Sequence, residues 1–213
     1  MIIKRIESVL RNAHAETRKI LAFAEKLSVE GKTILIHDHS HTVHDVLTHL
    51  KNIGRKFNVV IAEQDHEKTN YNIDRMHAAG ISFRVVPAYM LSHIHKQVDM
   101  LFFGALTLKD TMDFVMDPGT DSLIAEFNSD GIHSYMFIDT AKFSLWKSQK
   151  RDAIFIHEYL KKHVDDITEY VRVKYSHDRV PAKFFKKIIT NEGVFSPIQL
   201  KRLFDKKFKE ASK

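Results

Sequence analysis

The residues of this chain best suited to do chemistry form one polar turn, His37-Asp38-His39-Ser40-His41. The turn follows Thr33–Ile36, an apolar run typical of a buried strand, and precedes a helical pattern that opens at Thr42-Val43. It is therefore expected at the carboxyl end of a strand, where open α/β sheets bind their ligands. We expect Ser40 and the backbone N–H groups of Thr42 and Val43 to bind an anion, because helix N-termini attract anions without a charged side chain.

The histidines of the same turn raise the question of a metal site. His37, His39 and His41 alternate along the chain and could share one face, and imidazole suits zinc, copper or nickel. However, fourteen histidines are scattered over the chain, and no second cluster of Asp, Glu or His has clear ligand spacing. We therefore expect neither a metal nor another cofactor.

Strand and helix patterns alternate around this turn. Short β-branched or aromatic runs indicate strands at 33–36, 57–62, 81–87, 100–103 and 134–139. Helical spacing of apolar residues indicates helices at 2–30, 42–53, 66–79, 89–96, 119–129, 181–189 and 197–209, whereas residues 147–163 are polar and irregular. Such alternation is typical of βαβ units. The sequence predicts an α/β fold in which an N-terminal helix over 1–30 precedes one domain over 31–213, a Rossmann-like, mostly parallel sheet flanked by helices.

Parallel strands end at a common edge of their sheet, so the segments that follow them should meet there. These segments are His37–Thr42, Glu63–His66, Gly104–Leu106 and the helix start at Gly119-Thr120. The ligand-binding residues predicted at this edge are His37, Asp38, His39, Ser40, His41, Thr42, Glu63, Gly104, Ala105, Gly119 and Thr120.

Composition excludes several kinds of chemistry and location. The 213 residues include no cysteine, so a disulfide framework and a thiol nucleophile are both excluded. Charges enter the N-terminal apolar stretch within its first residues, and no apolar run approaches membrane-spanning length. We therefore expect a cytoplasmic protein that does not enter membranes.

The basic charge of the chain is concentrated near its C-terminus. Residues 183–213 hold nine Lys and Arg residues against three acidic ones, which accounts for the whole formal net charge of +6. A basic segment can favour RNA or an acidic partner. No pattern of aromatic and basic residues for base stacking accompanies it, so RNA association lacks support and a solvated helix face is preferred.

Several blocks of the chain resemble one family, in the same order. The turn at His37–Thr42 is similar to the family's T-H-C-H-S turn, and Val98–Leu106 resembles its V-D-x-V-x-V-G-A-D. Gly119-Thr120 matches the end of N-K-I-G-T, and residues 188–194 match I-I-T-E-x-G-V. The family comprises the alpha, beta and delta subunits of initiation factor 2B with ribose-1,5-bisphosphate isomerase and methylthioribose-1-phosphate isomerase. The chain resembles a divergent member whose N-terminal helical domain is truncated to one helix.

The departures from the family pattern fall on its chemistry. Asp38 stands where the family has a catalytic cysteine, and Leu106 stands where it has the aspartate of G-A-D. Asp117-Pro118 replaces Asn-Lys, and Asp65 or a neighbour replaces an arginine expected to bind phosphate. The resemblance thus implies a non-catalytic initiation factor 2B-like regulatory or scaffold protein acting through protein contacts. The alternative is a sugar-phosphate aldose–ketose isomerase with relocated groups, for which Asp38 is the candidate catalytic residue.

The resemblance also implies assembly through the C-terminal part of the chain. We expect a homodimer or a hetero-oligomer held by the predicted helices 181–189 and 197–209, whose apolar residues suit an interface. These residues are Phe184, Phe185, Ile188, Val194, Phe195, Leu203 and Phe204. The candidate small-molecule ligand is phosphorylated, either a sugar phosphate or a nucleotide.

Overall fold

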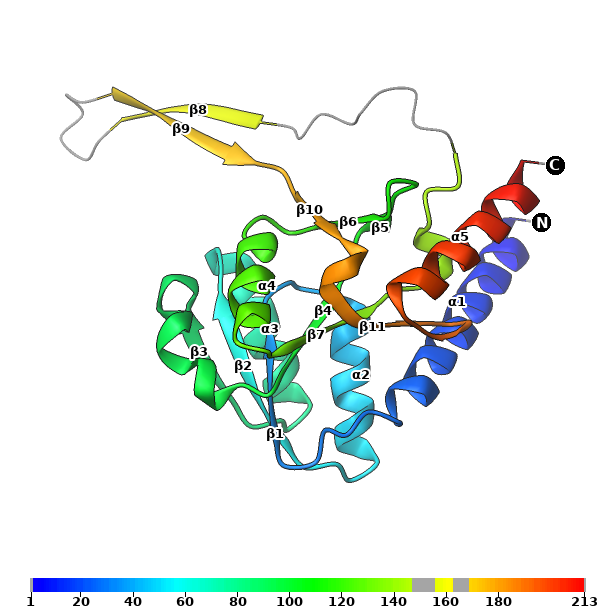
Figure 1. Ribbon diagram of the computed structural model, residues 1–213, viewed down its shortest axis with the longest axis horizontal. Coiled ribbons are helices and arrows are strands. Elements are labelled where there is room, and N and C mark those ends of the chain that lie inside the picture. The colour runs from blue at the N-terminus through cyan, green and yellow to red at the C-terminus, as the bar shows by residue number, and fades with distance from the viewer. Residues whose placement is uncertain (1, 147–155, 163–168, 213) are drawn as a thin grey trace.

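A mostly parallel sheet forms the centre of the computed structural model (Figure 1). The structure describes residues 2–146, 156–162 and 169–212. Within these residues the central sheet has seven strands, in the order β12-β11-β7-β4-β1-β2-β3. Neighbouring strands are parallel except β11 and β12, which pair antiparallel. The strands are β1 (Lys32–Ile36), β2 (Phe57–Glu63), β3 (Phe83–Pro87), β4 (Met100–Gly104), β7 (His133–Phe137), β11 (Phe185–Thr190) and β12 (Gly193–Phe195).

Helices cover both faces of this sheet, because successive residues of a buried strand point to opposite sides. The helices are α1 (Ile2–Ala24), α2 (His41–Asn52), α3 (His66–Ala78), α4 (Thr120–Ser129), α5 (Pro197–Ala211) and the 3₁₀ helix η1 (Ala88–Gln97). Ile34 and Ile36 of β1 pack in one buried cluster with α1, α2 and α3. Leu35 packs in the other cluster, with α4, α5 and η1. The predicted α/β class, with a mostly parallel sheet flanked by helices, is confirmed.

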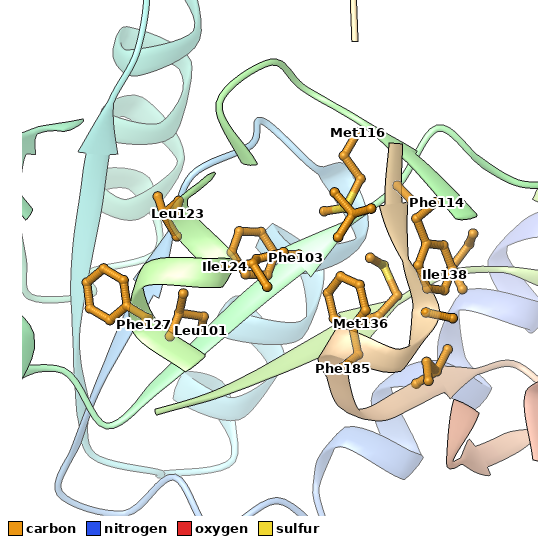
Figure 2. Close-up of a cluster of buried hydrophobic side chains, with 14 of the residues drawn as sticks. Leu101, Phe103, Phe114, Met116, Leu123, Ile124, Phe127, Met136, Ile138 and Phe185 are labelled. Atoms are coloured by element: carbon orange, nitrogen blue, oxygen red, sulfur yellow. The ribbon is translucent and has the colours of Figure 1, made fainter. Parts of the chain in front are cut away.

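The second cluster joins the central sheet to a small antiparallel sheet (Figure 2). The small sheet has the order β10-β6-β5, with β5 (Thr107–Leu108), β6 (Asp113–Met116) and β10 (Asp178–Pro181). The rings of Phe114 from β6 and Phe185 from β11 meet edge to face, with centroids 5.2 Å apart. This packing fixes the end of β6, and with it the start of α4, against the central sheet.

A hairpin extends from the body of the molecule (Figure 1). It consists of β8 (Ile156–Lys162) and β9 (Glu169–Tyr175), which pair antiparallel, and we call it the β8–β9 arm. The prediction of a polar, irregular segment over 147–163 is wrong for 156–162, which form a strand. The remainder of that segment lies outside the described residues.

The predicted helix over 181–189 is wrong. A short 3₁₀ turn, η3 (Ala182–Phe184), is followed by strand β11, which pairs in parallel with β7. Phe185, Ile188 and Ile189 are all buried, and their spacing fits a helical face as well as it fits a strand buried on both sides. Periodicity alone cannot separate these two cases for a short apolar run.

Other element boundaries differ by smaller amounts. Helix α1 ends at Ala24, before the predicted end at residue 30, and the chain then turns through Gly31 at a φ of 69°. Strand β3 begins at Phe83 rather than at residue 81, because Ile81 is still part of the turn after α3. None of the described helices combines the length and apolar character that a membrane span requires.

The apolar residues invoked for an interface through the C-terminal helices belong largely to the core. Phe185, Ile188 and Phe204 are almost fully buried within the chain. The ring of Phe204 stacks on Phe143 with centroids 5.7 Å apart. These side chains stabilise the monomer. The other residues of the predicted interface, Phe184, Val194, Phe195 and Leu203, are half-buried, so assembly through the C-terminal segment stays a prediction.

Candidate functional site

Two cavities border the edge of the sheet at which β1, β2 and β4 end. The large cleft, of about 720 Å³, is lined by His37, Glu63, Gln64, Lys68 and Gly119 among others. The small pocket, of about 130 Å³, is lined by Asp38, His39, Ser40, His41, Gly104, Ala105, Leu106, Met116, Asp117 and Lys142. The structure thus brings the four predicted segments together at one edge. Their part in ligand binding stays a prediction.

Two predicted residues line neither of these cavities. Thr42 lies in the first turn of α2, and Thr120 is fully buried with its Oγ1 donating to Asp117 O at 2.6 Å. Ser40 is the N-cap of α2, since its Oγ accepts from Val43 N at 3.4 Å. The hydroxyl groups of Thr120 and Ser40 therefore serve local structure, and an anion bound here would depend on backbone N–H groups.

Asp38 is buried beneath the turn, with 6% of its surface exposed. Its Oδ2 accepts from Gly104 N at 2.8 Å, whereas no described group bonds its Oδ1. Burial raises the pKa of Asp38 to about 7, against the lowering effects of the Gly104 hydrogen bond and of Lys142. At neutral pH Asp38 is therefore present in both protonation states, which suits a group that gives or takes a proton.

We expect a Gly104→Ala change to lower the free energy of unfolding by roughly 1–3 kcal/mol, the usual cost of overpacking. A Cβ at this position would lie 2.0 Å from Ser40 Oγ and 2.5 Å from Ser40 Cβ. The control is a Gly104→Ala, Ser40→Gly double variant, because glycine at an N-cap costs only a few tenths of a kcal/mol. Urea unfolding should show partial recovery in the double variant, and equal destabilisation of both proteins would contradict the steric explanation.

His37 is held as a neutral ring. It is 3% exposed, and Gln64 Nε2 lies 2.6 Å from its Nδ1 while also donating to its carbonyl oxygen. Burial lowers the pKa of His37 to about 4. The amide nitrogen of Gln64 can only donate, so we assign Nδ1 as the acceptor and Nε2 as the ring donor. Gly119 approaches this donor closely: a Cβ there would lie 3.5 Å from Nε2.

The other histidines of this region diverge instead of sharing a ligand. His39 Nδ1 lies 3.1 Å from Asp117 Oδ2, and His41 Nδ1 lies 2.8 Å from the Tyr71 hydroxyl. His44 is fully buried and bonds an asparagine of α3. In the part of the chain that the structure describes, no three His, Asp or Glu side chains converge on a possible metal position.

Two lysines at this edge are not among the ligand-binding residues predicted from the sequence. Lys68, in the first turn of α3, forms an ion pair with Asp117, its Nζ lying 2.9 Å from Oδ1. Lys142 ends the 3₁₀ turn η2 (Thr140–Lys142), and its Nζ donates to Ala105 O at 3.1 Å. Both follow the ends of predicted strands by a few residues. This position shortly after a strand is the sequence signal that could have identified both lysines. The predicted ligand-binding residues lie nearer to the strand ends.

Leu106 borders the small pocket with 62% of its surface exposed. Its backbone N–H donates to Val115 O at 2.9 Å, which ties the turn between β4 and β5 to β6. A hydrocarbon side chain can neither accept nor deliver a proton. Several titratable side chains, Asp38 and Lys142 among them, therefore line the small pocket, but the position of Leu106 offers no acid–base group.

The chain matches the description of one protein family over most of its length. The model of this family, described as "Initiation factor 2 subunit family", matches residues 1–197. The delta subunit of translation initiation factor eIF2B from Schizosaccharomyces pombe is 32% identical over 107 residues, which cover 49% of this chain and 23% of that protein.

Solved structures show the same fold at low identity. Translation initiation factor eIF-2B from Pyrococcus horikoshii OT3 superposes with a TM-score of 0.79 and 20% identity, over 92% of this chain and 70% of that one. The tetrameric eIF2B-beta2-delta2 complex from C. thermophilum gives a TM-score of 0.69 and 17% identity, over 96% of this chain and 64% of that one.

These similarities differ in how much of each protein they cover. The chain spans 23% of the length of the S. pombe delta subunit and 37% of the eIF2B alpha subunit from Dictyostelium discoideum, to which it is 28% identical. The family description, by contrast, extends over nearly the whole chain, and the resemblance to initiation factor 2B subunits is confirmed. The chain belongs to the initiation factor 2 subunit family.

Proposed function

We propose that this chain is a non-catalytic, initiation factor 2B-like regulatory or scaffold protein that acts through protein contacts. The observation that carries the proposal is the pair Asp38 and Leu106 at the positions where the related isomerases have their cysteine and aspartate. Two cavities lie at the surrounding edge of the sheet. Leu106, however, has a hydrocarbon side chain that cannot exchange a proton. A scaffold needs the fold and its surface, but it does not need an acid–base pair.

The large cleft is the site we propose for a phosphorylated small molecule. Lys68 lines it from α3, and Arg172 and Lys174 line it from the β8–β9 arm. Carboxylates of Glu63 and Glu126 line the same cleft. Lys68 already pairs with Asp117, so a phosphate in this cleft would bind near Arg172 and Lys174, and the carboxylates would accept hydrogen bonds from hydroxyl groups.

The arm also supplies the surface that we propose for assembly. Val171 and Val173 are 57% and 47% exposed and alternate with Arg172 and Lys174, which line the cleft. The two valines therefore lie on the opposite face of the ribbon. An isolated two-stranded ribbon is marginally stable in water, so this apolar face favours a protein partner. We propose a second copy of the chain as this partner. A solved relative of the same fold is a tetramer that contains two copies each of its beta and delta subunits.

Wild-type protein at tens of micromolar is expected to sediment as a dimer or larger species, and a Val171→Glu, Val173→Glu variant as a monomer. Two charges on each arm would have to be buried unpaired in the dimer, at a cost of several kcal/mol. The matched control is Ile198→Glu on α5, where the native side chain is 71% exposed. That change should leave the dimer intact. A monomeric wild type, or dissociation by Ile198→Glu alone, would count against assembly through the arm.

One observation favours the alternative function, a sugar-phosphate aldose–ketose isomerase. Asp38, with a pKa near neutrality, shares the small pocket with Lys142. Two titratable groups with shifted pKa values are what a proton transfer between neighbouring carbons requires. In this alternative Asp38 would remove the proton and Lys142 would stabilise the developing oxyanion. Turnover measurements decide between the two functions.

A further inference from the structure

Two hollows lie at the amino ends of β1, β2 and β3, at the opposite edge of the parallel sheet from the candidate site. The first, of about 300 Å³, is lined by Arg84, Asn58 and Ser82 among others. The second, of about 240 Å³, is lined by Lys51 and Lys56 and again by Asn58 and Ser82. Because the two hollows share these two lining residues, they adjoin, and we call them together the amino-edge groove.

The amino-edge groove carries positive charge that the chain does not neutralise. Lys51, Lys56 and Arg84 are exposed, and none of the three forms an ion pair with another described residue. The nearby carboxylates have other partners. Glu30 Oε2 accepts from the backbone N–H of Lys56 at 3.2 Å. Asp99 accepts from the lysine and from the following backbone N–H at the start of β1, at 2.8 and 2.9 Å. The three cations are therefore available to an anionic partner.

Neutral polar side chains line the groove beside these cations. The amides of Asn58 and Gln97 and the hydroxyl of Ser82 are exposed, and these side chains form no hydrogen bond with another described residue. A side-chain amide offers N–H donors and a carbonyl acceptor, which complement the C=O and N–H groups of a peptide main chain. The groove therefore presents charged groups for carboxylates and neutral groups for the chain that carries them.

The aromatic residues of the groove disfavour a nucleic acid as its ligand. Phe57 and Phe83 line the groove, but both are half-buried and pack against the core cluster shared with α1, α2 and α3. Their rings therefore offer little free surface on which bases could stack. Glu30 and Asp99 would in addition repel a continuous phosphate backbone, whereas a peptide can place its few carboxylates away from them.

We propose that the amino-edge groove binds an extended, acidic peptide segment of a partner protein. Alternate side chains of an extended chain point to the same side and lie about 7 Å apart, so acidic residues at alternate positions present carboxylates to both hollows. One carboxylate binds the guanidinium of Arg84 and the next binds the amines of Lys51 and Lys56, while Asn58 bonds the peptide group between them. The formal net charge of +6 attracts such a partner. This surface is distinct from the β8–β9 arm and from the large cleft, and binding to it depends on neither.

Fluorescence anisotropy with a labelled model peptide tests this binding on the full chain. The probe has about ten residues, with aspartate and serine in alternation, so that its carboxylates lie on one side of the extended chain. The wild type should bind it saturably. A Lys51→Gln, Lys56→Gln variant should bind it at least about tenfold more weakly, because charge-assisted hydrogen bonds are the stronger ones. Absence of saturable binding up to about 1 mM peptide would overturn the inference.

A matched variant separates the groove from the net charge of the chain. Lys206→Gln, Lys209→Gln also removes two positive charges, from exposed lysines of α5 that form no ion pair with a described residue. It should change the affinity by less than about twofold, because salt screens distant surface charges. A loss equal to that of the Lys51 and Lys56 variant would show that net charge alone attracts the peptide, and the inference would be wrong.

The first hollow is tested by a single substitution. Arg84→Gln should weaken peptide binding by at least about fivefold, because it removes the one guanidinium that lines this hollow. Unchanged binding would show that the first hollow takes no part, which contradicts an extended peptide lying across both.

Single-stranded RNA of the same charge distinguishes a peptide site from a nucleic-acid site. Unlabelled oligouridylate should displace the labelled peptide at least about tenfold less effectively than unlabelled peptide does, because the groove lacks free aromatic rings for stacking. Tighter binding of the RNA than of the peptide, lost in the Lys51→Gln, Lys56→Gln variant, would identify a nucleic-acid site and overturn the inference.

Acetylation of the wild-type lysines locates the peptide without any substitution. Peptide at about ten times its Kd should slow the acetylation of Lys51 and Lys56 by at least about fivefold, because most of the protein is then occupied. The acetylation of Lys206 and Lys209 should not change, as peptide mass mapping can show. Unaltered rates at Lys51 and Lys56 would overturn the inference. Sedimentation of the β8–β9 arm variants is measured without peptide and has no bearing on this outcome.

Discussion

Purified protein is expected to leave ribose-1,5-bisphosphate and methylthioribose-1-phosphate unconverted. Aldose–ketose isomerisation needs one group that removes a proton and one that returns it, and each positioned group contributes about a hundred- to ten-thousand-fold. Leu106 cannot take part, and Asp38 is a carboxyl group where the related isomerases have a thiol. Loss of both contributions would lower turnover by about 10⁴- to 10⁸-fold, which brings it close to background. The measurement is product formation followed by phosphorus or proton NMR over hours.

The control for this prediction restores the residue types of the isomerases. An Asp38→Cys, Leu106→Asp double variant should regain a trace of activity only if the large cleft still binds the phosphate group. Rapid turnover by the wild-type chain, abolished by Asp38→Ala and by Lys142→Met, would contradict the non-catalytic proposal. That result would establish the alternative, in which Asp38 and Lys142 are the relocated acid–base groups.

The alternation of strands and helices could be predicted because each buried strand is short, apolar and followed by a clear turn. Residues 33–36 and 57–62 are too short for helices and are closely bounded by Gly31, Gly54 and polar turns, which favours strands. The segment 181–189 could not be assigned correctly. Its four buried residues satisfy a helical and a strand pattern equally, and its pairing with β7 depends on residues some fifty positions earlier.

In the candidate site, too, features set by neighbouring residues in the sequence could be predicted, and features set by distant residues could not. The turn at 37–41 was found because it directly follows a strand. Asp38, however, owes its environment to Gly104 and Lys142, which reach it from β4 and η2. Neither contact follows from spacing within the turn. The raised pKa of Asp38 therefore could not be predicted before the topology placed β4 beside β1.

An Asp38→Asn variant is expected to be more stable than the wild type, and this difference in the free energy of unfolding should grow by about 2–3 kcal/mol as the pH rises from 5 to 8. In the folded protein the pKa of Asp38 is about 7, above its ordinary value of 3.8. Its contribution to stability is therefore complete below about pH 4 and is lost as the pH rises through 7, because the unfolded state ionises Asp38 while the folded state keeps it protonated. Asparagine has no proton to lose, so the variant is spared this cost. Urea unfolding of both proteins at several pH values measures the difference.

Titration of His37 and His44 changes the free energy of unfolding with pH in the opposite direction to Asp38. The variant must therefore be compared with the wild type at each pH. Burial lowers the pKa of each ring to about 4, below the ordinary value of 6.5. Their contribution to stability is complete above 6.5 and is lost as the pH falls to 4, by about 3 kcal/mol for each ring. Both proteins contain these rings, so their effect cancels in the difference and only the Asp38 term remains. A difference that stays constant from pH 5 to pH 8 would show that burial does not raise the pKa of Asp38.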